Sequence, residues 1–195
     1  MRATSFSASV DEALLARART GEDAAMEQIF RCFEAPVYSL ARRLTRSPHD
    51  AEDVLQETFM EIVRSIRSFR GDGSLAGWIR KVAANKALMK LRRRGGRTFE
   101  ELVPDELGDE GGGRPSHGSA VSTAAERVDL ETALGRLSDA ARVVIWLHDV
   151  EGYSHDEIAA MAGKTASYSK SQLARAHARL REMLAPAQTS EGSCT

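Results

Sequence analysis

The residues with the clearest chemical meaning in this 195-residue chain form a run of positive charges between Trp78 and Arg97. The run contains eight basic side chains and no acidic one: Arg80, Lys81, Lys86, Lys90, Arg92, Arg93, Arg94 and Arg97. Neighbouring cations repel one another, and a solvated helix face usually mixes both signs. The pattern therefore favours binding of a polyanion such as nucleic acid over a merely solvated face.

A group of opposite charge precedes this run. It consists of five carboxylates: Asp50, Glu52, Asp53, Glu57 and Glu61. Such a cluster can hold a metal ion in a nuclease, but it also suits a solvated or partner-binding helix face, which we favour. The five histidines are scattered, and Cys32 and Cys194 fit no metal spacing. We therefore predict no metal, no cofactor, no catalytic centre and no small-molecule substrate.

Two helices must carry these charges. Ser47 followed by Pro48 predicts a helix start, and Gly71 with Gly73 predicts its end. Apolar residues recur along it at spacings of four, three, four and three residues: Leu55, Phe59, Ile62, Ile66 and Phe69. Ser74 can cap the second helix. Its expected buried face comprises Leu75, Trp78, Ile79 and Val82.

The N-terminal part of the chain extends this helical pattern. We expect residues 1–10 to be disordered, residues 11–19 to form a short helix, and residues 23–45 to form a longer one that Pro36 can kink. The longer helix has its own apolar stripe: Ile29, Phe33, Val37, Leu40 and Leu44. Residues 11–95 are therefore predicted to form one helical domain.

A second helical domain is predicted over residues 122–185. An acidic, Gly-rich linker, residues 96–121, separates it from the first, and residues 186–195 form a tail. Its predicted helix starts are Ser138, the Ser154–Glu157 capping box and Thr165. The last two helices, joined by a short turn at Gly163, form a helix-turn-helix pattern. The final helix is expected to turn Leu173, Leu180 and Leu184 inward.

Composition narrows the class of protein further. Apolar residues make up 42% of the chain and the formal net charge is −1. No apolar run approaches the roughly 20 residues that span a membrane, and the first ten residues lack the apolar centre of a signal peptide. We expect an all-α protein of two small domains, located in the cytoplasm and not inserted in a membrane.

The first domain resembles region 2 of the extracytoplasmic-function (ECF) group of bacterial sigma factors. The matching stretches are Asp50–Phe59, Phe69–Gly71, Trp78, Asn85 and Leu91–Arg93. The second domain resembles region 4 of the same sigma-70 family. Its matching residues include Asp149–Gly152, Ser154, Glu157–Ala159, Gly163, Lys170, Ser171, Leu173, Arg175 and Arg179.

This resemblance implies a factor that binds core RNA polymerase, directs promoter recognition and DNA melting, and is paired with an anti-sigma factor. The polymerase-docking surface implied is Glu52, Asp53, Gln56 and Glu57. The residues implied for the −10 element and melting are Phe69, Arg70, Gly71, Asp72, Arg80, Lys81, Asn85, Arg92 and Arg93. Those implied for the −35 element are Ser167, Tyr168, Lys170, Ser171, Gln172, Arg175 and Arg179.

The sequence departs from the family pattern inside the helix-turn-helix. Positions that usually carry apolar side chains hold Ala162, Lys164 and Ser169. Three alternatives stay open, and these departures motivate the first of them. One is a sigma-like mimic that sequesters an anti-sigma factor without reading DNA, and another is an ordinary helix-turn-helix regulator. The third, an enzyme acting on nucleic acid, has little support in the residues.

Overall fold

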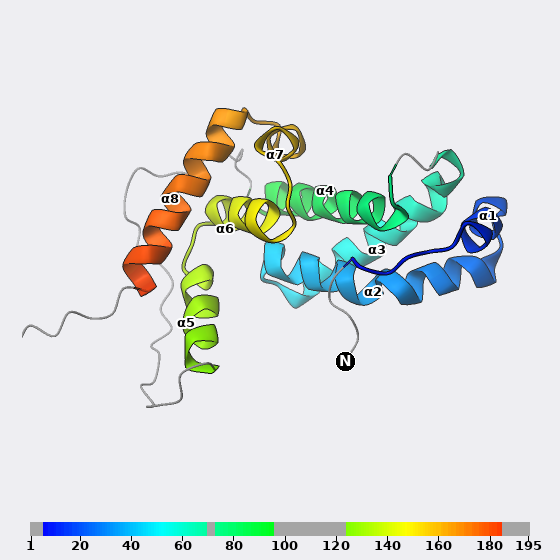
Figure 1. The fold of residues 1–195 in the computed structure, drawn as a ribbon, viewed down its shortest axis with the longest axis horizontal. Coiled ribbons are helices and arrows are strands. Elements are labelled where there is room, and N and C mark those ends of the chain that lie inside the picture. Colours follow the sequence, from blue (N-terminus) through cyan, green and yellow to red (C-terminus); the bar gives the residue numbers. More distant parts are fainter. Residues whose placement is uncertain (1–5, 70–72, 96–123, 185–195) are drawn as a thin grey trace, which may run out of the picture. The chain divides into compact units, whose positions relative to one another are not determined.

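The computed structural model describes residues 6–69, 73–95 and 124–184, and these residues contain helices and no strand (Figure 1). The chain divides into two compact units. The first holds α1 to α4, and the second holds α5, α6, α8 and most of α7. The all-α, two-domain prediction is confirmed. The predicted linker, the tail and the residues Arg70, Gly71 and Asp72 lie outside the described part.

The first unit is a small helical bundle. Its elements are α1 (Glu12–Thr20), α2 (Asp23–Thr45), α3 (Pro48–Ser65), the 3₁₀ turn η1 (Ile66–Ser68) and α4 (Leu75–Gly95). Side-chain caps begin three of them. Asp11 accepts from the Leu14 amide at 2.6 Å, Ser47 from the Asp50 amide at 3.2 Å, and Ser74 from the Gly77 amide at 3.0 Å.

The core of this unit lies where α2, α3 and α4 pack together. The largest side chains that are fully buried there are Phe33, Ile29, Leu40, Leu44, Ile62, Ile66, Ile79 and Leu88. Helix α2 continues through the buried Pro36 to Thr45. The helix expected to reach Phe69 instead ends at Ser65, and η1 completes it. Of the N-terminal segment expected to be disordered, residues 1–5 lie outside the described part, and the Phe6 ring stacks on Phe33 with 6.4 Å between the ring centroids.

The second unit contains a helix-turn-helix. Its elements are α5 (Ala124–Gly135), α6 (Asp139–Ile145), the π-helical turn η2 (Trp146–Val150), α7 (His155–Ala162) and α8 (Ala166–Leu184). The predicted caps are present: Ser138 accepts from the Ala141 amide at 3.3 Å, Ser154 and Glu157 form a capping box, and Thr165 caps α8. Positive φ at Gly152 (75°) and Gly163 (66°) allows the two turns around α7.

Helices α6 and α8 supply most of the second core. Its buried members are Leu137, Ala141, Ile145 and Ala176, with Leu134, Leu173, Leu180 and Met183 packed against them. The prediction that Leu184 points inward is wrong, because this side chain is 42% exposed at the end of α8. Within the described residues, no helix combines the length and the apolar character needed to cross a bilayer.

Candidate nucleic-acid interface

The basic helix α4 has two different faces. Because successive residues turn by about 100° in an α-helix, Lys86, Lys90 and Arg93 lie on one side, and Lys81, Asn85 and Arg92 lie on another. The first side is turned to the acidic helix α3, with which α4 packs. Met89, a large apolar side chain that is 38% exposed, lies between the two sides.

Ion pairs connect the first face of α4 with α3. Lys90 Nζ lies 2.5 Å from Asp53 Oδ2 and 3.7 Å from Asp50 Oδ1. Three further pairs extend this ladder: Lys86–Glu61 at 3.3 Å, Arg93–Glu57 at 3.9 Å and Arg94–Asp50 at 3.2 Å. The neighbouring helix α3 therefore supplies negative charge that relieves part of the repulsion along α4. We expected only a bound polyanion to do this and did not consider α3 as a second source.

The central pair of the ladder shifts both of its members. The hydrogen bond from Lys90 lowers the pKa of Asp53, and the hydrogen bond to Asp53 raises the pKa of Lys90. Both shifts favour the charged forms. The two groups lie near solvent, with side chains 32% and 25% exposed. Asp53 is thus both a structural partner of α4 and a residue assigned by sequence to a docking surface.

One side of α3, which we call the exposed stripe, combines polar and apolar side chains and faces away from the bundle. Glu52 and Gln56, which the resemblance assigns to the docking surface, are exposed. Met60 and Val63 continue the same stripe at spacings of four and three residues, and they are 53% and 58% exposed. Sequence reasoning missed these two as surface residues. The helical spacing from Glu52 was the signal that could have identified them.

The start of α4 is connected to the end of η1 by aromatic contact. The Phe69 ring lies 5.2 Å from the Trp78 ring with 30° between their planes. Phe69 is buried, whereas Trp78, which we expected on the buried face of this helix, is only half-buried. Of the other −10 candidates, Lys81 and Arg93 are exposed, and Arg80, Asn85 and Arg92 are half-buried.

Helix α8 presents most of the predicted −35 residues to solvent. The exposed ones are Ser167, Lys170, Ser171, Arg175 and Arg179. Tyr168 is half-buried, with the Lys164 ammonium 5.8 Å from its ring centroid. The assignment of Gln172 to DNA does not fit, because this side chain is only 5% exposed. Gln172 shares the inner face of α8 with Ser169 and Ala176, three and four residues away.

Three histidines that are distant in sequence meet beside the helix-turn-helix. Both oxygens of Asp149 are used: Oδ1 lies 2.7 Å from His148 Nδ1, and Oδ2 lies 2.6 Å from His177 Nε2. The His148 and His155 rings stack with centroids 4.4 Å apart. His155 Nδ1 in turn lies 3.0 Å from the hydroxyl of Ser169. Thus the unusual polar residue at position 169 has a specific partner on α7.

The cluster changes the acid–base properties of its members. Burial lowers the pKa of His155, and the charges of His148 and Lys170 lower it further. For Asp149, burial acts to raise the pKa, but the hydrogen bonds from His148 and His177 lower it below the ordinary value. Among the described residues, no group of three histidine, cysteine or acidic side chains is arranged to hold a metal ion. The network is best described as a polar connection between η2, α7 and α8.

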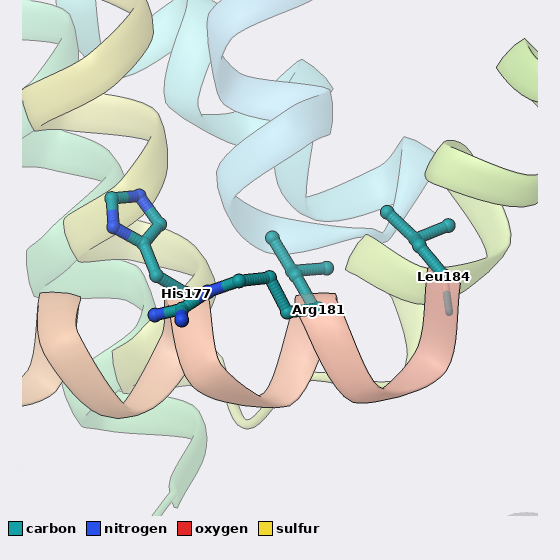
Figure 2. A pocket seen from close by; sticks show the side chains of 4 residues that line it. His177, Arg181 and Leu184 are labelled. Carbon is teal, nitrogen blue, oxygen red and sulfur yellow. The ribbon is translucent and has the colours of Figure 1, made fainter.

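The described residues also include a hollow of about 400 Å³ on the C-terminal half of α8 (Figure 2). It is lined by His177, Leu180, Arg181 and Leu184. Two leucines, one imidazole and one guanidinium make up this lining.

Comparison with known proteins matches each unit to one family. Residues 29–97 match Sigma-70 region 2, and residues 127–180 match Sigma-70, region 4. The chain is 34% identical to the ECF RNA polymerase sigma factor SigE of Mycolicibacterium smegmatis, over 85% of this chain and 65% of that protein. It is 32% identical to the ECF RNA polymerase sigma factor SigM of Mycobacterium tuberculosis, over 89% of this chain and 84% of that protein.

Solved structures share the fold. One is CnrH in complex with the cytosolic domain of CnrY, with a TM-score of 0.53, 24% identity, and coverage of 89% of this chain and 96% of that one. The other is the sigma factor RpoE of Bartonella quintana in complex with the anti-sigma factor NepR. Its TM-score is also 0.53 at 24% identity, covering 81% of this chain and 95% of that one.

Proposed function

The chain belongs to the ECF group of the sigma-70 family of RNA polymerase sigma factors, and from that premise we propose that it binds core RNA polymerase and directs it to promoters. The observation that carries the proposal is the match of both units, in order, to the two family regions. A lone helix-turn-helix regulator has no need for the first unit. The chain acts in this proposal as an initiation factor without enzymatic activity, in the cytoplasm where the polymerase works.

The exposed stripe of α3 is the proposed docking surface for polymerase. Glu52 and Gln56 supply polar contacts, and Met60 with Val63 supply apolar area that is otherwise exposed to water. Interfaces commonly combine an apolar centre with a polar rim. Asp53 and Glu57 belong to the same surface but also pair with α4, so their contribution to docking is mixed with a contribution to the fold.

DNA contacts are divided between two helices in this proposal. The −10 side comprises Phe69, Arg80, Lys81, Asn85, Arg92 and Arg93, together with Arg70, Gly71 and Asp72, which lie outside the described residues. The −35 side comprises Ser167, Tyr168, Lys170, Ser171, Arg175 and Arg179 on α8, whose N-terminal half is the part that usually reaches base edges. Gln172 is left out of this set because it is buried.

Regulation by an anti-sigma factor is proposed by likeness to relatives. RpoE of Bartonella quintana was solved with the anti-sigma factor NepR, and CnrH was solved with the cytosolic domain of CnrY. We propose that a protein of this class holds the present chain inactive. The alternative of a mimic that only sequesters such a partner rested on a weakened helix-turn-helix. The contact between His155 and Ser169 reduces its support.

Run-off transcription with purified core polymerase tests the proposal. Core polymerase plus this chain should yield RNA of one defined length from a promoter that the chain recognises, and core alone should not. The mimic would bind an anti-sigma factor yet give no such product. Glu52→Lys serves as a matched loss-of-docking variant, because this exposed residue is not a partner in the ion-pair ladder.

A further inference from the structure

Two residues of α8, Ser169 and His177, are joined to each other by a series of contacts through α7 and η2. The series runs from the Ser169 hydroxyl to His155 Nδ1 at 3.0 Å, and from the His155 ring to the His148 ring, with 4.4 Å between the centroids. It continues from His148 to Asp149 at 2.7 Å and from Asp149 to His177 at 2.6 Å. We call these five residues the polar network. Because its two ends are eight residues apart on α8, the network holds this helix at two points about 12 Å apart along its axis.

The Ser169 end of this network lies within the part of α8 assigned to the −35 element. Ser169 is 1% exposed, whereas Lys170 and Ser171, which follow it, are exposed. The helix backbone joins these residues rigidly, so the position of Ser169 determines where its two neighbours lie. The His177 end is nearer to solvent, with a side chain that is 44% exposed. The network therefore fixes α8 most closely at the residues that would meet base edges.

Polar contacts restrict the orientation of α8 in a way that apolar contacts do not. A hydrogen bond has a preferred distance and angle, whereas hydrophobic attraction is non-directional. The apolar core of this unit, which includes Ile145 and Ala176, supplies the attraction between α6 and α8. The contact between His155 and Ser169 adds a directional constraint between α7 and α8. The core thus supplies stability, and the network supplies alignment.

We propose that His155 is a positioning residue for reading of the −35 element, which acts through Ser169 to hold the first half of α8 in the orientation that reading requires. The inference rests on the proposed function, which assigns exposed residues of α8 to that element. Direct reading depends on hydrogen bonds between side chains and base edges. These bonds weaken steeply when their angles change, so a small rotation of α8 reduces the preference for one sequence. His155 itself need not touch DNA.

The test measures how strongly the holoenzyme discriminates between two promoters. One is a promoter duplex that the parent holoenzyme enriches from random DNA, and the other is the same duplex with its upstream element scrambled. His155→Ala and Ser169→Ala should each lower the ratio of the two affinities by about fivefold, the factor that one ordinary hydrogen bond supplies. An inactive fraction of protein lowers both affinities alike, so it leaves the ratio unchanged. Binding to core polymerase should stay at the parent level.

Three further variants separate alignment from folding. Ser138→Ala removes the cap of α6 in the same unit, so it should lower the melting temperature and keep the parent ratio. His155→Asn places an amide near the position of the imidazole Nδ1 and should keep most of the ratio. The double variant His155→Ala with Ser169→Ala should lose no more than either single variant, because all three lack the same contact.

The outcomes distinguish this inference from the function beneath it. A parent holoenzyme with a ratio near one overturns the assignment of α8 to the −35 element, and this inference with it. A parent that discriminates, with folded His155→Ala and Ser169→Ala retaining the ratio in full, overturns the role of His155 alone. Two further results also contradict that role: losses that multiply in the double variant, and a loss in His155→Asn as large as in His155→Ala. If His155→Ala is poorly folded, Ser169→Ala decides the outcome by itself, because it removes one hydroxyl and introduces a strong helix former.

Discussion

We propose that some side chains in this protein take part both in folding and in recognition. Asp53 pairs with Lys90 across the α3–α4 contact while it lies beside the exposed stripe that begins at Glu52. Ser169 and Gln172 lie on the helix that we assign to the −35 element, yet both are buried. The type of a residue therefore gives its chemistry, and the fold decides whether that chemistry faces a partner or the core.

Thr58 offers a test of the core at this scale. It is fully buried in α3, and within the described residues its hydroxyl has no hydrogen-bond partner. An unsatisfied buried hydroxyl costs roughly 1–3 kcal/mol. Thr58→Val keeps the shape and removes the hydroxyl, so the free energy of unfolding should rise by about 1 kcal/mol. Urea denaturation measures it, and Thr58→Ala, which leaves a cavity, should instead destabilise. A loss of stability in Thr58→Val would show that the hydroxyl has a partner after all.

We expect His155 to make the stability of the second unit depend on pH. Its pKa is depressed in the folded state by burial and by the nearby positive charges of His148 and Lys170, against the weaker opposing charges of Asp156 and Asp149. Between the folded pKa and the unfolded value near 6.5, the unfolded chain binds more protons than the folded one. Stability from this group is therefore complete above the unfolded pKa and falls as the pH drops through the window below it.

The corresponding variant is His155→Gln, which cannot titrate and keeps a polar group near Ser169. Urea titrations at about pH 7.5 and about pH 5, on either side of the ordinary histidine pKa, should show a smaller loss of stability at acid pH in the variant than in the parent. His49, which lies in the first unit, provides the control through His49→Gln. Parallel pH profiles for the parent and His155→Gln would rule out this role for His155.

At the scale of helices, α3 and α4 act as one element with two outer faces. A buried apolar core and the ion-pair ladder hold the two helices together. A single exposed ion pair of this ladder adds little to the stability of the fold. The ladder also leaves the outer stripe of α3 and the Lys81–Arg92 side of α4 on different sides of the pair. One small bundle can thus present an acidic–apolar surface to a protein and a basic surface to DNA.

Charge reversal on α3 tests this division. Glu52→Lys should weaken binding to core polymerase by roughly tenfold or more while leaving the melting temperature unchanged. Asp53→Lys should weaken binding and also lower the melting temperature, because it brings a second cation against Lys90. Glu27→Lys, on an exposed part of α2, controls for net charge. The assignment fails if Glu52→Lys binds core polymerase as tightly as the parent does.

The helix starts can be predicted closely from the sequence, whereas the contacts between the helices cannot. Ser47, Ser138 and Thr165 cap where their side chains predict, because capping is a local interaction. The pair of Asp149 and His177 joins residues 28 positions apart, and neither residue signals the other in sequence. The burial of Gln172 could not be predicted from the sequence, because a polar side chain at an inward position breaks the apolar pattern that marks a buried face.

For the whole molecule, we propose that the two units make different kinds of DNA contact. Helix α4 is dense in positive charge, whereas α8 mixes hydroxyl, aromatic and basic side chains near its start. Losing a phosphate contact weakens binding by the same amount on every DNA sequence. It also reduces the slope of the logarithm of the binding constant against the logarithm of the salt concentration, by roughly 0.9 on duplex DNA or 0.7 on single strands. Losing a base contact costs about 1–3 kcal/mol at one position. The first helix should therefore supply affinity and the second should supply sequence preference.

A salt series with the holoenzyme measures this difference. Arg92→Ala should flatten the salt dependence of promoter binding and preserve the ranking of the parent and −35-mutated promoters. Lys170→Ala or Arg175→Ala should reduce the difference in binding affinity between those two promoters. Arg181→Ala, which removes the same charge from an exposed position further along α8 and outside the −35 set, provides the matched control. If the parent binds the two promoters with very different affinities while Lys170→Ala and Arg175→Ala both leave that difference unchanged, α8 does not read the −35 element.

The central claim is that this chain confers promoter specificity on core polymerase. The most direct measurement maps the 5′ ends of RNA made from random-sequence DNA by core polymerase with and without the chain. We predict that the chain concentrates initiation at start sites preceded by two recurrent elements at fixed spacing, and that Glu52→Lys removes this concentration. The same distribution of 5′ ends with and without the chain would contradict the account.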